Sequence, residues 1–130
     1  MKKLLKNVAV SSMLLVACFV CVVAVNAASA TSTLTYNNSV TVTKSSVGTS
    51  FLTTINATGI YNVSPISVQT QVGRKMFNLA WYDSGKSTTK VATTGYNYPT
   101  RWSANGTYDT RAIWTNMTSG STISAAFTLN

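Results

Sequence analysis

In the segment 121–129, the apolar residues Ile123, Ala125, Phe127 and Leu129 alternate with Thr122, Ser124, Ala126 and Thr128. A period of two is the pattern of a β-strand that buries one face. The segment 107–115 alternates in the same way, and residues 117–120 between the two suit a turn. We therefore predict a hairpin at this end of the chain. Its predicted core residues are Ile123, Ala125, Phe127 and Leu129 in the second arm and Tyr108, Thr110, Ala112 and Trp114 in the first.

More segments of this kind fill the chain from residue 31 onward, and no window has the spacing of an amphipathic helix. Strands are predicted at 33–36, 39–44, 50–58, 60–64, 66–72, 76–82, 87–94 and 100–103, with turns or loops at 45–49, 73–75, 83–86 and 95–99. The segment 87–94 is polar on both faces, as a protected edge strand is. About seven to nine short strands with frequent turns predict an all-β fold, a single antiparallel β-sandwich. The further predicted core residues are Leu34, Tyr36, Val40, Val42, Phe51, Thr53, Ile55, Ala57, Ile66, Val68, Thr70, Val72, Phe77, Leu79 and Trp81.

Two short motifs resemble parts of immunoglobulin-like domains. Residues 79–82 resemble the strand that carries the core Trp, and residues 105–110 resemble the tyrosine corner. Thr110 stands where an antibody-type domain has its second cysteine. The likeness is therefore to the disulfide-free immunoglobulin-like modules of secreted Gram-positive bacterial proteins. It implies an immunoglobulin-like sandwich with Trp81 in the core.

The first 30 residues have the form of a signal peptide. Three lysines precede an apolar run at 8–25, and the small residues Ala28, Ser29 and Ala30 suit cleavage after Ala30. A second candidate position follows Ala27. We therefore predict a leader at 1–30, a single domain at 31–130, and a secreted, extracellular location.

Two other interpretations of the leader stay open. The apolar run is nearly long enough to remain as a membrane anchor. The residues 15–18, Leu-Val-Ala-Cys, also resemble a lipobox, in which Cys18 would be lipidated, although the apolar stretch 19–25 follows it where a polar tether is usual. The predicted contact with a membrane is through this leader or a lipidated Cys18.

The residues beyond the leader contain no Cys and no His, because both cysteines, Cys18 and Cys21, lie within it. The usual general base, thiol nucleophile and metal ligands are therefore missing. Asp83 and Asp109 are the only acidic residues, and a glycosidase would need them to face each other. We predict no enzyme activity, no cofactor and no metal site. One self-reaction stays open, a cross-link between Lys44 and Asn130 with Asp109 as catalyst.

The charge is strongly positive. The full chain carries +8, and the segment after the leader has seven basic residues against two acidic ones, a net charge of +5. Such a surplus attracts anionic polymers or surfaces. The cations are spread singly, so we do not predict a nucleic-acid partner.

Aromatic residues near one cation form the predicted binding site. Rings beside a cation and many hydroxyl groups suit stacking with a sugar or contact with an anionic cell-wall polymer. The alternative is that Trp102 and one tyrosine simply close the end of the sandwich. The predicted ligand-binding residues are Tyr82, Tyr96, Tyr98, Arg101 and Trp102.

Two functions are compatible with these features. The first is a secreted, non-enzymatic binding or adhesion module at the bacterial cell envelope, with an extracellular glycan or an anionic wall polymer as partner. The second is a secreted cationic antimicrobial protein, similar in outline to the lactococcin-972-type bacteriocins, which are exported, cationic, Cys-free and all-β.

Overall fold

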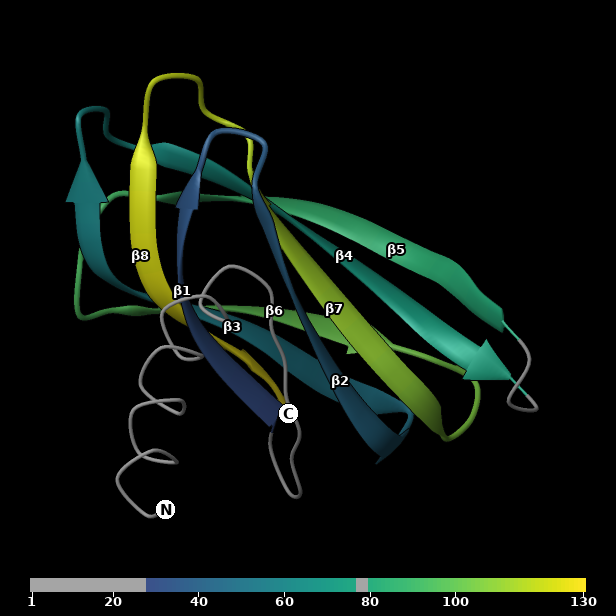
Figure 1. The fold of residues 1–130 in the computed structure, drawn as a ribbon. Helices are drawn as coiled ribbons and strands as arrows, with labels where there is room; N and C mark the ends of the chain where they lie inside the picture. Colours follow the sequence, from purple (N-terminus) through teal and green to yellow (C-terminus); the bar gives the residue numbers. More distant parts are fainter. Residues whose placement is uncertain (1–27, 77–79) are drawn as a thin grey trace, which may run out of the picture.

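Two four-stranded antiparallel sheets pack face to face in the computed structural model, which describes residues 28–76 and 80–130 (Figure 1). These residues form no helix, and so none long and apolar enough to cross a membrane. The predicted β-sandwich is confirmed; the predicted leader, apart from Ala28, Ser29 and Ala30, lies outside the described residues. The strands are β1 (Ala28–Thr35), β2 (Ser39–Val47), β3 (Ser50–Tyr61), β4 (Ile66–Met76), β5 (Ala80–Val91), β6 (Asn97–Ser103), β7 (Tyr108–Asn116) and β8 (Thr122–Leu129).

The strand order is that of a jelly roll. The first sheet has the order β1-β8-β3-β6 and the second the order β2-β7-β4-β5. Strands from the two halves of the chain pair in turn, β1 with β8, β2 with β7, β3 with β6 and β4 with β5. Eight strands in two such sheets are the jelly-roll arrangement. An immunoglobulin domain instead pairs its first two strands in one sheet, whereas β1 and β2 lie in different sheets here, so the predicted immunoglobulin-like character is not confirmed.

The predicted C-terminal hairpin is wrong in its pairing. β7 and β8 are alternating strands joined by a turn around Gly120, as expected, but they belong to different sheets. The turn therefore carries the chain across the sandwich. The two strands meet through their side chains, and the rings of Trp114 and Phe127 lie 5.3 Å apart in the core.

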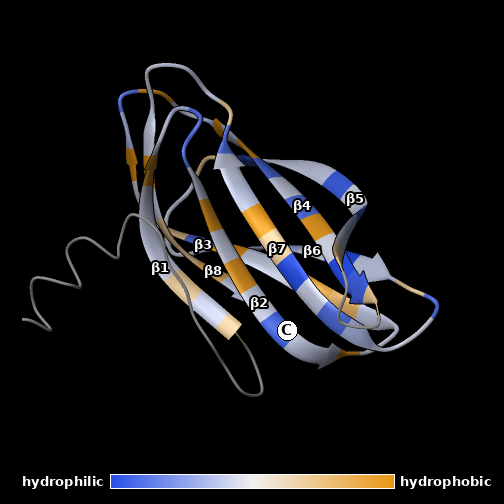
Figure 2. Ribbon diagram, turned by 45° about the vertical axis from the view of Figure 1, so that its right-hand side comes forward, coloured by the Kyte–Doolittle hydropathy of each residue, from blue (hydrophilic) through white to orange (hydrophobic). Residues whose placement is uncertain are grey.

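The core residues follow the predicted alternation closely. Every second residue of β8 is buried, as are Phe51, Thr53, Ile55 and Ala57 of β3. Figure 2 shows apolar and polar bands alternating along β2, β4 and β7. Tyr36 is an exception, because it lies in the turn after β1 and is 46% exposed. Phe77 and Leu79 lie outside the described residues.

A β-bulge replaces the turn predicted at 83–86. Val72 pairs with Gly85 and Gly73 pairs with Asp83, so Ser84 is an extra residue within a continuous β5. Its hydroxyl donates to the Val72 carbonyl at 3.3 Å. The loop predicted at 73–75 is likewise wrong, because β4 continues through this segment. Asp, Ser and Gly favour turns and bulges alike.

The bulge exchanges the two faces of β5. Beyond it, Tyr82 pairs with the buried Arg74 and so shares the inner side, whereas Trp81 pairs with Lys75 on the outer side. The Arg111 guanidinium lies 5.0 Å from the Trp81 ring on that outer face. The prediction that Trp81 belongs to the core is therefore wrong.

The remaining local differences are small. A second bulge at Thr58 lets β3 continue through Gly59, where a break was predicted, and β2 extends through most of the turn predicted at 45–49. The edge position predicted for 87–94 is confirmed for its strand segment, because β5 pairs only with β4 in its sheet. The two residues of the cross-link left open above lie in different sheets. Lys44 belongs to the second sheet, whereas Asn130 pairs with Leu52 of the first.

A buried asparagine joins the strand ends at one end of the sandwich. The Asn116 side chain is fully buried and donates to the Leu34 carbonyl and the Ser121 hydroxyl, both at 3.0 Å. Its carbonyl oxygen accepts from the Thr118 amide at 2.9 Å, and its backbone amide donates to the Asn38 carbonyl at 3.1 Å. Asn116 thus connects β1, the turn before β2, β7 and the start of β8.

Replacing this residue should destabilise the whole fold. Asn116→Ala removes the buried hydrogen bonds of this side chain to the Leu34 carbonyl, the Ser121 hydroxyl and the Thr118 amide, so we expect the free energy of unfolding to fall by about 3 kcal/mol. Chemical denaturation measures the change. Asn105→Ala is the control, because Asn105 is exposed and has no hydrogen bond to a described residue. Equal stability of the two variants would contradict the role of Asn116.

Candidate functional site

Tyr98 and Trp102, two of the predicted binding residues, make their contacts within the protein. Both lie on the half-buried side of β6 and pack against the core. The Tyr98 hydroxyl accepts hydrogen bonds from the amides of Ala92 and Thr93, at 3.2 and 3.0 Å. These amides favour the phenolate and lower the pKa of Tyr98 below its ordinary value. Tyr98 thereby holds the loop between β5 and β6.

Trp102 closes the space between the two sheets at their β5–β6 side. Its Nε1 donates to the Thr53 hydroxyl at 2.8 Å, and its ring stacks on Phe51 with centroids 6.5 Å apart. A Cβ on Gly85 of β5 would lie only 2.9 Å from the Trp102 ring, so glycine allows the close approach. These contacts fit the alternative interpretation, in which Trp102 closes the sandwich.

The other predicted residues point in different directions. Tyr96 is 64% exposed in the loop before β6, and Arg101 is exposed on the outer side of β6, where it donates to the Ser50 hydroxyl. Tyr96 and Trp102 are separated by about 20 Å of extended chain. Tyr82 lies on β5, in the other sheet. The structure therefore does not gather the five predicted residues into one site.

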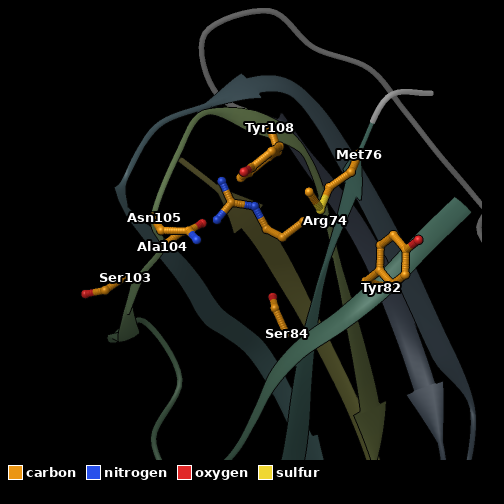
Figure 3. Close-up of a pocket in the computed structure, with 8 residues that line it drawn as sticks. All are labelled: Arg74, Met76, Tyr82, Ser84, Ser103, Ala104, Asn105 and Tyr108. Atoms are coloured by element: carbon orange, nitrogen blue, oxygen red, sulfur yellow. The ribbon is translucent and has the colours of Figure 1, made fainter. Parts of the chain in front are cut away.

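A recess opens at the end of the sandwich where Tyr82 lies. Its volume is about 360 Å³, at the small end of the range for ligand pockets. Side chains of β4, β5 and β7 and of the segment 103–105 surround it, as Figure 3 shows. We refer to it as the end recess, lined by Arg74, Met76, Tyr82, Ser84, Ser103, Ala104, Asn105 and Tyr108.

Arg74 is the charged residue of the end recess, and it is only 6% exposed. Its Nη2 donates to the carbonyls of Val47, Gly48 and Gly106 at 3.1–3.4 Å. The guanidinium also lies over two aromatic rings, 5.1 Å from the Phe51 centroid and 5.0 Å from that of Tyr108. Burial lowers the pKa of Arg74, an effect opposed by the neighbouring Tyr108, but a guanidinium stays charged at neutral pH.

No carboxylate neutralises this cation within the described part of the chain. The sequence has only two acidic residues, and both have other partners. Asp83 lies 3.9 Å from Arg111, and Asp109 accepts from the Ser46 amide at 3.1 Å. Neutral carbonyls and rings alone therefore compensate the buried charge, an arrangement that leaves electrostatic attraction for an external anion.

The same two acids lie on strands that are not adjacent. They lie on the outer side of the second sheet, and β4 runs between the strands that carry them. Residues 28–76 and 80–130 also contain no group of three or more His, Cys, Asp or Glu side chains that could hold a metal.

The end recess could have been found from the sequence by extending the alternation of β4. Arg74 is the next residue in the series of predicted core residues Ile66, Val68, Thr70 and Val72. The prediction of a loop at 73–75 ended this series before Arg74. An arginine at an inward position of a strand is unusual and therefore indicates a polar site.

Comparison with known proteins supports the fold and goes no further. No protein-family model and no curated protein matches the sequence. The chain is similar to the crystal structure of the Yersinia pseudotuberculosis-derived mitogen, with a TM-score of 0.51 over 80% of this chain and 82% of that one. The sequence identity is 13%, so the similarity shows a shared β-sandwich fold alone.

The contacts of Trp102 lead to a stability prediction. Trp102→Ala removes the ring that fills the space between β5 and β6, and we expect a loss of about 3 kcal/mol in the free energy of unfolding. Tyr96→Ala removes an exposed ring and should change it by less than about 0.5 kcal/mol. Thermal or urea unfolding compares the two. Similar stabilities would contradict the stabilising role of Trp102.

Proposed function

We propose that the protein is a secreted, non-enzymatic binding module that acts at the bacterial cell envelope on an extracellular glycan or an anionic wall polymer. The binding site in this proposal is the end recess. Of the five residues predicted from the sequence, Tyr82 is the one that lines it. The Gram-positive origin implied by the resemblance stays a prediction.

The observation that carries the proposal is the composition of the end recess. It combines two tyrosine rings, several hydroxyl groups, an amide and one cation with no acid beside it. Tyrosine rings stack on sugar rings, hydroxyls and amides bond to sugar hydroxyls, and a guanidinium attracts anionic groups. The positive charge of the chain adds a long-range attraction toward a polyanion.

The second candidate, a cationic antimicrobial protein similar in outline to lactococcin-972-type bacteriocins, shares secretion, charge and an all-β fold with the first. It differs in its effect on cells, because it would inhibit growth. A zone of growth inhibition around the purified protein would favour it, and retention on wall polymers without inhibition would favour the binding module.

Binding should be measurable by retention on purified wall polymers. We expect retention on teichoic acid or peptidoglycan at low salt and release at about 1 M salt, where the screening length is only about 3 Å. Tyr82→Ala should lower retention severalfold. The matched control is Tyr61→Ala, because Tyr61 is equally exposed, 51% against 54%, but lies at the far end of β3. Absence of retention at low salt would contradict the proposal.

Strand β1 predicts where the leader is removed. Ala28 is fully buried and pairs with Leu129, so cleavage after Ala30 would take three residues from β1. Cleavage after Ala27 leaves the strand whole. We therefore expect the secreted protein to begin at Ala28, which the intact mass of protein from culture medium determines. A mass corresponding to a start at Thr31 would contradict this prediction.

A further inference from the structure

We propose that the end recess recognises acidic sugars, and that Arg74 contacts the sugar carboxylate through its Nη1. This inference rests on the proposed function, because it names the class of glycan that the same site would bind. Three observations carry it: the unused donors of Arg74, the neutral character of the other lining residues, and the size of the recess.

The Arg74 guanidinium has hydrogen-bond donors that bond to no residue in the described segments. The three backbone carbonyls are all bonded to Nη2, and Nε is buried without a partner. Nη1 has no hydrogen bond to any residue in the described segments, and it is not among the fully buried unpartnered atoms. Figure 3 shows the guanidinium end lying between Tyr108 and Asn105. Nη1 is therefore the donor that a ligand in the end recess can reach.

The surroundings of Arg74 match a single negative charge. Among the lining residues of the described chain, Arg74 is the only charged one. A carboxylate brings one charge, whereas a terminal phosphate brings nearly two. A monoanion would thus neutralise Arg74 without leaving a surplus charge in a site whose other lining residues are neutral.

The other lining residues suit the remainder of a sugar. Tyr82 and Tyr108 provide ring faces, Ser84 and Asn105 provide groups that bond to hydroxyls, and Met76 provides an apolar contact. The volume of about 360 Å³ suits one pyranose ring rather than a long stretch of polymer. The site therefore recognises one acidic sugar unit, at the end or along the side of a glycan.

An NMR titration of the full secreted protein tests this. Glucuronic acid is the probe, and glucose, which lacks the carboxylate, is the neutral control. We expect the Arg74 Nε–H signal and the amides of 103–106 to shift with glucuronic acid. Glucose should bind at least about tenfold more weakly, because it cannot form the charge-assisted hydrogen bond. Equal affinities for the two sugars would overturn the proposal.

A rim variant tests the role of Arg74 without disturbing the core. Arg74→Met would remove buried bonds and could prevent folding, so Asn105→Asp is preferred, since Asn105 is exposed beside the guanidinium. Its new carboxylate would occupy Arg74, and we expect the affinity for glucuronic acid to fall about tenfold. Asn97→Asp is the matched control, because it makes the same charge change on the exposed side of β6. Equal loss in both variants would overturn the proposal.

The outcomes separate this inference from the function on which it rests. Retention on wall polymers with no preference for glucuronic acid would overturn the acidic-sugar assignment and leave the binding module standing. Absence of retention on every polymer would contradict the proposed function itself. Glycerophosphoglycerol, a phosphodiester, is the third probe, and tighter binding of it than of glucuronic acid would also overturn the carboxylate assignment.

Discussion

Pairing between the two halves of the chain is the constraint on which the rest of the structure depends. β1 pairs with β8, β2 with β7 and β3 with β6, so each sheet joins segments that are far apart in the sequence. The strands from Ala28 onward contain no cysteine, so no disulfide holds these pairs. The buried faces must do so, with Trp114 and Phe127 in contact between the sheets. Such non-local pairing is typical of slowly folding β-proteins.

The Ser84 bulge connects this architecture to the candidate site. One extra residue in β5 turns Tyr82 toward the inner side, where Arg74 of β4 lies, and turns Trp81 outward. Without it, Trp81 would face the inner side of the sandwich. The bulge therefore assembles an aromatic ring and a cation at the open end, while Trp102 fills the neighbouring space beside Gly85. Bulges commonly redirect side chains next to functional sites.

The sequence predicted which residues are buried much better than which strands pair. Alternation of period two identifies a buried face locally, and it was right for β3, the first part of β4 and β8 because those faces are fully covered. Partner strands are decided by contacts across the whole chain, so the hairpin expected between β7 and β8 was wrong. Asp83, Ser84 and Gly85 have the chemistry of a turn, and only the tertiary structure selects a bulge instead.

The candidate site was predictable only in part. Tyr82 is among the predicted binding residues and does line the end recess, because the Ser84 bulge turns it toward the inner side of the sandwich. Tyr98 and Trp102 are also among the predicted binding residues, but they are held within the protein by hydrogen bonds to Ala92, Thr93 and Thr53. Arg74 is not among the predicted binding residues, because the strand predicted at 66–72 ends before it.

We propose that an inward-facing cation without an acidic partner makes the end recess a binding surface. Hydrogen–deuterium exchange of the protein with and without a soluble wall-polymer fragment tests it most directly. We expect slower exchange at the end of β4, in the first part of β5 and at 103–106, around Arg74 and Tyr82. Protection confined to the loop around Tyr96, or to the outer face around Arg111, would contradict it.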